Sequence, residues 1–170
     1  MAGLAHLGVA FASKRLAPNI PLWILLVCAY GIDIVFGIFW IAGIENIPKP
    51  GTVPWNPWSH GLFMSVIWSI VASLITWLIS RNFRNSVIIG LLIFSHWVVD
   101  FISHPMKAVF PTDTGLPLFF EGSPIVGLGL WSTRIGVNIG EYGTLVIGIV
   151  VYIFTLLWLR KKKKQQTIIS

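Results

Sequence analysis

Apolar residues form long runs in this chain, separated by short polar or proline-containing segments. Four runs are long enough to cross a bilayer, whose hydrocarbon core needs about 20 mostly apolar residues per helix. These runs cover residues 21–44, 60–80, 86–106 and 140–159. We expect each of them to be a membrane-spanning helix. The pattern therefore predicts an all-α fold, a polytopic membrane helix bundle.

A fifth apolar run, at residues 3–16, is too short to span a membrane and ends with Lys14 and Arg15. We expect a short half-membrane or interfacial helix that packs against the first span. The segment 107–139 is rich in glycine and apolar residues but is too interrupted to form a span. It predicts a loop, with or without short helices, that dips into the outer interface.

The composition supports this picture and excludes two classes of protein. Only 11% of the 170 residues are charged, whereas 55% are hydrophobic. Soluble domains carry about 25% charged residues, so a soluble enzyme and a disordered chain are both excluded. We expect residues 1–160 to form a single membrane domain and residues 161–170 to form a basic cytoplasmic tail.

The basic residues predict the orientation of the spans. Nine of the twelve fall on one side if the four spans alternate, and the positive-inside rule makes that side cytoplasmic. These nine are Lys14, Arg15, Arg81, Arg84, Arg160, Lys161, Lys162, Lys163 and Lys164. Both termini are then cytoplasmic, and the loops at 45–59 and 107–139 face outward. The Lys-rich tail is expected to contact anionic membrane lipid and not nucleic acid, because no folded basic domain accompanies it.

Four ionisable residues lie inside the apolar segments: His6, Asp33, His96 and Asp100. An Asp at the centre of a membrane helix costs about 2.5–3.5 kcal/mol on insertion scales, and such residues mark functional sites by default. At 1.5 Å per helical residue, all four lie about 12–21 Å from the cytoplasmic edge. His60 lies higher, at about 27–30 Å, and a tilted or partly unwound start of its helix brings it into the same layer.

These five residues predict a metal site. His96 and Asp100 are one helical turn apart, so both side chains can reach one cation. Imidazole nitrogen and carboxylate oxygen are both good zinc ligands, and a set without cysteine favours a catalytic ion with a position open for water. We therefore expect a divalent metal, best matched by zinc, that lowers the pKa of a bound water to about 7. Either Asp33 or Asp100 is a candidate general base.

Other polar residues receive weaker predictions. His104, two turns beyond His96, and Trp131 are candidates for a supporting or substrate-contacting role. Glu141 is a third such candidate, although a contact with the N-terminal dipole of its own span also explains it. Glu45 and Asp113 are expected to be interfacial and solvated.

Several short motifs resemble those of the bacterial membrane-bound metal-dependent hydrolase family, one branch of which is regulated by the LexA repressor. They are Ala5-His6-Leu7-Gly8, Gly31-Ile32-Asp33, Pro57-Trp58-Ser59-His60-Gly61-Leu62, His96-Trp-Val-Val-Asp100, Leu116-Pro-Leu and Gly127-Leu-Gly-Leu-Trp131-Ser132. The chain lacks the family's second carboxylate near Asp33 and an extra His before His60, which favours a single metal. The order of His and Asp residues is also similar to zinc-dependent phospholipase C. That similarity implies hydrolysis of a phospholipid or other phosphodiester, and the family implies a location in the bacterial inner membrane. The predicted orientation of the spans places the substrate at the outer leaflet.

Three other functions remain open at this point. A row of His and Asp residues could relay protons or pass a metal ion, although no acidic path continues to the cytoplasm. Two histidines from different spans could hold haem, although the adjacent carboxylates disfavour it. A structural metal in a non-catalytic protein would use the same ligands. The sequence leaves the substrate and the oligomeric state undetermined.

Overall fold

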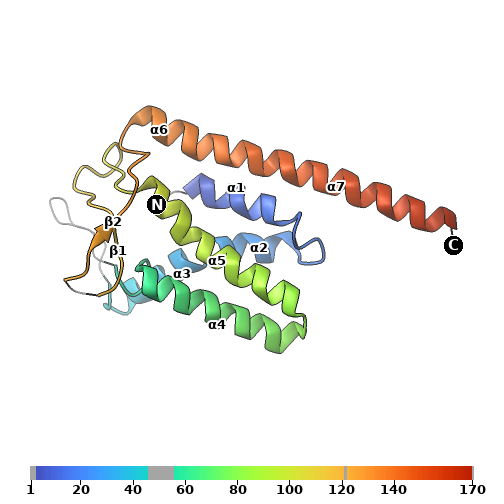
Figure 1. Ribbon diagram of the computed structural model, residues 1–170, viewed down its shortest axis with the longest axis horizontal. Helices are drawn as coiled ribbons and strands as arrows, with labels where there is room; N and C mark the ends of the chain where they lie inside the picture. The colour runs from blue at the N-terminus through green and yellow to red at the C-terminus, as the bar shows by residue number, and fades with distance from the viewer. Residues whose placement is uncertain (1–2, 46–55, 121, 170) are drawn as a thin grey trace.

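The computed structural model describes residues 3–45, 56–120 and 122–169 and is mostly helical (Figure 1). The prediction of an all-α membrane helix bundle is confirmed. Three helical runs are long and apolar enough to cross a membrane: α4 (Leu62–Ser80), α5 (Phe83–Ser103) and residues Arg134–Thr167. A bent pair, α2 (Leu22–Ala29) and α3 (Gly31–Ile41), makes up to a fourth. Much of the predicted outer loop at 45–59 lies outside the described residues.

The first predicted span is broken and not one straight helix. Its two parts, α2 and α3, meet at Tyr30 with a bend of 55°. Gly31 begins α3 at a point where a β-carbon would come within 3.2 Å of the Ile93 side chain on α5. The break matters for the site because Ala29 lies in the last turn of α2, where carbonyls have no partner in their own helix.

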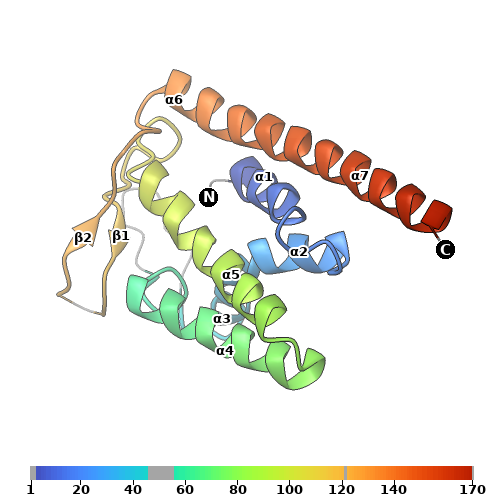
Figure 2. The same cartoon turned by 45° about the vertical axis from the view of Figure 1, so that its right-hand side comes forward.

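Small residues let the helices of the bundle approach closely. The α4–α5 contact places Gly90 against the backbone of Ser69 and the side chain of Ser73. The helix α1 (Gly3–Ser13) lies beside the last helix, α7 (Thr144–Ile169), with Gly8 packed directly on Gly148; Figures 1 and 2 show the two helices side by side. Close approach through glycine and serine is typical of helix packing in membranes, where burial of apolar surface gives no drive for association.

The predicted outer segment contains a short hairpin as well as helix. Strands β1 (Leu116–Pro117) and β2 (Ile125–Val126) pair antiparallel at the end of the bundle opposite the C-terminus (Figure 2). The short helix α6 (Arg134–Asn138) and the π-helical turn η1 (Ile139–Gly143) then lead without a break into α7.

The last helix is longer than its apolar run. The helical run Arg134–Thr167 has 34 residues, or about 51 Å at 1.5 Å per residue, against a hydrocarbon core of about 30 Å. The tail predicted at residues 161–170 thus continues α7 as far as Ile169 and projects beyond the rest of the bundle (Figure 1).

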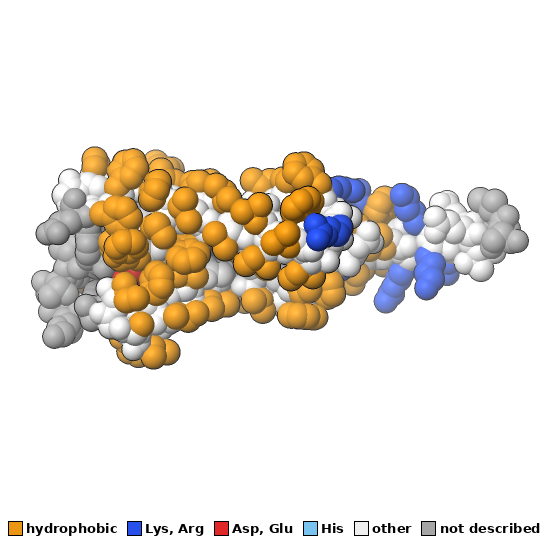
Figure 3. All heavy atoms as spheres, turned by 90° about the horizontal axis from the view of Figure 1, so that it is seen from below, with side chains coloured by type: hydrophobic (Ala, Val, Ile, Leu, Met, Phe, Trp, Pro, Cys, Tyr) orange, Lys and Arg blue, Asp and Glu red, His pale blue; other side chains and the backbone are white. Residues whose placement is uncertain are grey.

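Basic residues gather at one end of the molecule, and apolar side chains cover much of the visible face between the ends (Figure 3). The Arg84 guanidinium donates to the Leu16 carbonyl. Arg15 stacks over the Trp158 ring at 4.2 Å. These contacts join the three basic segments that the sequence assigns to one side. The assignment of that side to the cytoplasm stays a prediction.

Candidate metal centre

The five predicted ligands converge from four parts of the chain. His6 comes from the first turns of α1, Asp33 from the first turn of α3, His60 from the turn before α4, and His96 and Asp100 from α5. The side chains are nearly removed from solvent, with exposed fractions of 10% for Asp33 and 6% or less for the others. The predicted proximity is confirmed, and their role as ligands stays a prediction.

Imidazole nitrogens face carboxylate oxygens throughout the cluster. The Asp100 carboxylate is central: Oδ1 lies 3.4 Å from His6 Nε2, and Oδ2 lies 3.4 Å from His96 Nε2 and 3.8 Å from His60 Nε2. Asp33 Oδ1 lies 3.3 Å from His60 Nε2 and 3.6 Å from His96 Nε2. All five side chains thus direct a ligand atom toward a common region.

These separations fit ligands around an ion better than hydrogen bonds. A charge-assisted N–H···O bond spans about 2.7–2.9 Å, shorter than any of the five contacts. Ligand atoms about 2.0–2.1 Å from a tetrahedral ion lie about 3.3–3.4 Å apart. Consistent with this, four of these atoms are buried and lack a hydrogen-bond partner: His6 Nε2, Asp33 Oδ1, His96 Nε2 and Asp100 Oδ1.

The broken helix fixes the tautomer of His96. Its Nδ1 lies 2.8 Å from the carbonyl oxygen of Ala29, at the end of α2. Because a carbonyl can only accept, Nδ1 carries the proton and a neutral His96 presents the lone pair of Nε2 to the carboxylates. Metal-binding histidines commonly donate their second ring N–H in this manner.

His60 is supported by Ser59 and Glu45, neither of which the sequence predicts as part of the site. Its Nδ1 lies 2.8 Å from Ser59 Oγ, and the same hydroxyl donates to Glu45 Oε2 at 2.6 Å. The prediction that Glu45 is solvated was wrong, because only 2% of the residue is exposed. No local pattern relates Glu45 to His60, since they are 15 positions apart and meet only through tertiary contact.

Glu141 holds the start of α1 and does not join the cluster. Its carboxylate accepts the backbone N–H of Ala5 at 2.9 Å, one residue before His6. The Tyr30 hydroxyl donates to the carbonyl of Gly3 in the same turn. Glu141 therefore stabilises the N-terminal end of α1 by accepting a free backbone N–H of its first turn. This contact helps to hold His6 in place.

His104 forms a separate pair with Asp113 in the outer segment. Its Nδ1 lies 2.7 Å from Asp113 Oδ2, and the amides of Met106 and Gly115 also donate to that carboxylate. Asp113 is 1% exposed, so the prediction of a solvated residue was wrong. Burial favours its neutral form, but His104 and the two amides outweigh burial and hold the pKa of Asp113 below its ordinary value.

Trp131 also lies outside the cluster. It is 4% exposed and packs with Ala5 and Met106, and its indole fills the space that a β-carbon on Gly140 would need. Trp131 thus packs beside the first turns of α1, and its predicted substrate contact stays untested.

The donor set is suited to a divalent ion. Two groups have ligand atoms all within 4.8 Å of one another: His6, His96 and Asp100, and Asp33, His60 and His96. The shared His96 nitrogen has one lone pair and can bind only one ion. Two carboxylates with three neutral imidazoles carry a charge of about −2, which a divalent cation balances.

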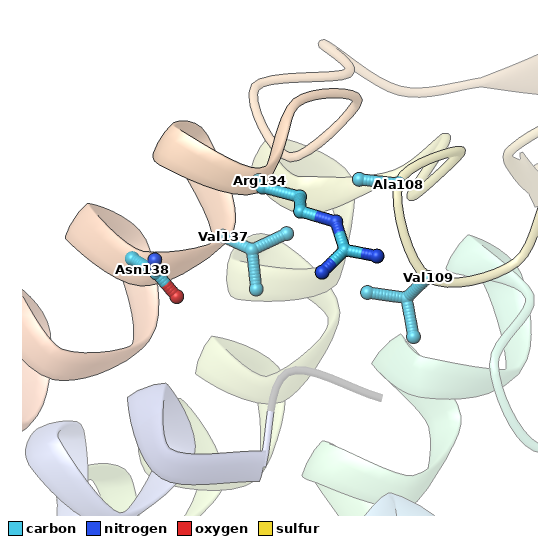
Figure 4. Close-up of a pocket in the computed structure, with 5 residues that line it drawn as sticks. All are labelled: Ala108, Val109, Arg134, Val137 and Asn138. Carbon is cyan, nitrogen blue, oxygen red and sulfur yellow. The ribbon is translucent and has the colours of Figure 1, made fainter.

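A hollow of about 300 Å³ lies at the end of the bundle opposite the C-terminus, between α6 and the segment after α5 (Figure 4). Its lining residues are Ala108, Val109, Arg134, Val137 and Asn138 (Figure 4). None of the five cluster residues lines it. Asp33 is the most exposed member of the cluster, with 10% of its side chain accessible.

The chain matches no protein-family model, no curated protein and no solved structure at the similarity required for a match. The resemblance to membrane-bound metal-dependent hydrolases therefore stays an expectation that rests on the short motifs.

Proposed function

We propose that this protein is a membrane-embedded hydrolase with a divalent metal, best matched by zinc, held by His6, Asp33, His60, His96 and Asp100. One observation carries the proposal. Nitrogen and oxygen atoms of five side chains from separate parts of the chain converge at 3.3–3.8 Å, and four of these atoms are buried without a hydrogen-bond partner. An unpaired polar cluster of this kind is costly inside a membrane unless a cation compensates it.

The two carboxylates are suited to different roles. Both oxygens of Asp100 face imidazoles and its side chain is 2% exposed, which supports a role as a ligand. The Asp33 side chain is 10% exposed and contacts two histidines. Asp33 is therefore the better candidate to act instead as the base that accepts a proton from an attacking water, with the other four residues as ligands. When bound, the metal would lower the pKa of a water molecule and would act as a Lewis acid toward a carbonyl or phosphoryl oxygen.

We propose a phospholipid or another phosphodiester at the outer leaflet as the substrate class. The position of the cluster supports access from that side: His60 precedes α4 and Asp100 lies in the last turn of α5, whereas Arg81 and Arg84 lie at the opposite ends of these helices. The choice of a phosphodiester itself rests on the similarity in the order of His and Asp residues to zinc-dependent phospholipase C.

A turnover screen in nanodiscs tests this activity. We expect zinc-loaded wild type to hydrolyse a phosphodiester or phospholipid, and Asp33→Asn to lose at least 100-fold in kcat, since general-base catalysis contributes about 10²–10⁴-fold. Thr155→Val removes a buried hydroxyl on α7 that bonds only within its helix and should keep wild-type turnover. Full activity of Asp33→Asn would refute its role as base.

A non-catalytic protein with a structural metal is the second candidate. The side chains of His6, His96 and Asp100 are 2% exposed or less, and a closed site is typical of structural zinc. This alternative predicts that chelation lowers the melting temperature while no substrate is turned over. Transport is less favoured, because no acidic path continues from the cluster along these helices: α4 has no acidic residue and Asp100 is the only one in α5.

We also propose that both termini are cytoplasmic and that the protein resides in a bacterial inner membrane. The basic end of the bundle supports this orientation through the positive-inside rule. In a Cys28→Ser background, which removes the only cysteine, Lys164→Cys should be labelled only after the cytoplasmic side is opened. Ser132→Cys should be labelled in intact cells, and the reverse pattern would invert the topology.

A further inference from the structure

Glu45 is a buried carboxylate that contacts none of the five cluster residues yet is connected to one of them. Its Oε1 accepts the backbone N–H groups of Trp58 at 2.8 Å and Ser59 at 3.0 Å. Its Oε2 accepts the Ser59 hydroxyl at 2.6 Å, and the Ser59 oxygen lies 2.8 Å from His60 Nδ1. A continuous chain of hydrogen bonds thus runs from Glu45 to the cluster.

The directions of these bonds are fixed by chemistry. A carboxylate can only accept, so the single proton of the Ser59 hydroxyl points to Glu45. The Ser59 oxygen is then left as an acceptor toward the ring, and His60 must carry its proton on Nδ1. The lone pair of His60 Nε2 consequently faces Asp33 and Asp100, at 3.3 and 3.8 Å.

We propose that Glu45 is a positioning residue that acts through Ser59 to hold His60 in the tautomer whose Nε2 can bind a metal. The consequence for metal binding rests on the proposed function, whereas the control of the tautomer does not. His96 obtains the same tautomer from the Ala29 carbonyl. His60 lies in the turn before α4, and it obtains that tautomer from a side chain, the Ser59 hydroxyl.

Ser59 itself is not placed as a nucleophile. The residue is 0% exposed, and its proton is directed to Glu45, away from His60. A reacting atom has no approach to the hydroxyl, and the base would have to take a proton that points the other way. The Ser59–His60 contact therefore orients the ring.

The substitution Glu45→Gln separates control of the His60 tautomer from simple stabilisation of the turn through the backbone N–H groups of Trp58 and Ser59. The glutamine carbonyl should take the place of Oε1, where it can still accept both backbone N–H groups. The amide NH₂ then faces Ser59 and donates to its oxygen. The Ser59 proton must turn toward His60 Nδ1, which moves the ring proton to Nε2 and removes the lone pair from the cluster.

Nitrogen-15 NMR of the histidine rings tests the tautomer directly in metal-free protein. The chain has four histidines, so the signals can be assigned by substitution. We expect His60 to be protonated on Nδ1 in wild type and on Nε2 in Glu45→Gln. The matched control is Asp113→Asn, a second buried carboxylate that accepts two backbone N–H groups and contacts a histidine. It should leave the His60 tautomer unchanged.

Zinc titration supplies an independent measurement. Loss of a group that supports a metal-bound histidine typically weakens affinity 10–100-fold, and we expect a loss in this range for Glu45→Gln. In the Glu45→Gln, Ser59→Ala double variant no hydroxyl forces the wrong tautomer, so its affinity should return to that of Ser59→Ala alone. A double variant that binds zinc more weakly than Ser59→Ala would contradict this route, because Glu45 would then act by holding the Trp58 and Ser59 amides and not through the hydroxyl.

The proposal is overturned if His60 keeps its Nδ1 proton in Glu45→Gln, if wild type carries the proton on Nε2, or if Asp113→Asn changes the tautomer equally. If Glu45→Gln shows the expected tautomer shift but wild type binds no metal, the proposed function fails while the role of Glu45 in setting the tautomer stands. The two failures are therefore distinguishable.

Discussion

The imidazole rings of His6 and His96 are stacked, with centroids 3.7 Å apart and planes within 5° of parallel. The rings come from α1 and α5, and both direct Nε2 toward the carboxylate of Asp100. Two stacked imidazolium ions would repel at this distance. The stack is better suited to neutral rings whose lone pairs face a cation, and it connects the short helix α1 to the spanning helix α5.

This connection predicts that zinc stabilises α1 through His6. A ligand at 100 times its Kd adds about 2.7 kcal/mol to the stability of the folded state, which makes amide exchange that requires opening of the bound structure about 100-fold slower. We expect amide hydrogen exchange in residues 3–13 to slow by up to that factor when zinc is added to wild type. In His6→Ala the same segment should respond little. An equal slowing in His6→Ala would show that α1 takes no part in binding.

The contact between Gly8 and Gly148 predicts that a larger side chain between α1 and α7 displaces His6 and weakens the metal site. A β-carbon on Gly148 would overlap the Gly8 carbonyl, so α1 must move away from α7 and carry His6 with it. Overpacking of this kind costs about 1–3 kcal/mol. We expect Gly148→Ala to lower both the thermal unfolding midpoint and the zinc affinity.

Gly37→Ala is the matched control for that substitution. It also lies in an apolar helix, but nothing lies within 4 Å of the added β-carbon. Alanine should be neutral or stabilising there because it has the higher helix propensity. Equal losses in the two variants would mean that the Gly8–Gly148 contact does not position α1.

The His104–Asp113 pair predicts a pH dependence of stability in the outer segment. The folded-state pKa of Asp113 lies below its ordinary value of 3.8. Its stabilising contribution is therefore fully present above pH 3.8 and is lost as the pH falls from 3.8 through the lower folded-state pKa. The thermal unfolding midpoint of wild type should fall in this acidic window. Asp113→Asn should have a lower midpoint than wild type at pH 7, but its midpoint should fall less between pH 7 and this window.

The pH profile of the difference between the two proteins is the decisive quantity. It should shrink as the pH falls below 3.8. A difference that stays constant from pH 7 into this window would mean that ionisation of Asp113 does not stabilise the fold.

Much of the bundle follows from the sequence because the bilayer constrains it strongly. Runs of about 20 apolar residues locate the spans, and the helical rise places His6, Asp33, His96 and Asp100 in one layer. His60 could be added only as an expectation, since its depth depends on how the turn before α4 is built.

The missed features depend on tertiary contact. The break at Tyr30 occurs inside an unbroken apolar run, so hydropathy alone predicts one straight span. Glu45 and Asp113 read as polar residues in loops, where solvation is the usual state. Their burial is compensated by the Ser59 hydroxyl and nearby amides, and by the ion-pair contact of Asp113 with His104. No local pattern identifies these partners.

The central claim is that the cluster binds a metal, and quantitative zinc analysis of purified protein tests it most directly. Wild type, after zinc loading and removal of free ion, should retain about one zinc per chain, since the His96 nitrogen can serve only one ion. Asp100→Ala should retain little or none, because Asp100 contacts all three histidines of the cluster. Asp113→Asn, which lies outside the cluster, should retain the wild-type amount. Wild type without bound metal, or Asp100→Ala with the same zinc content and affinity as wild type, would contradict the account.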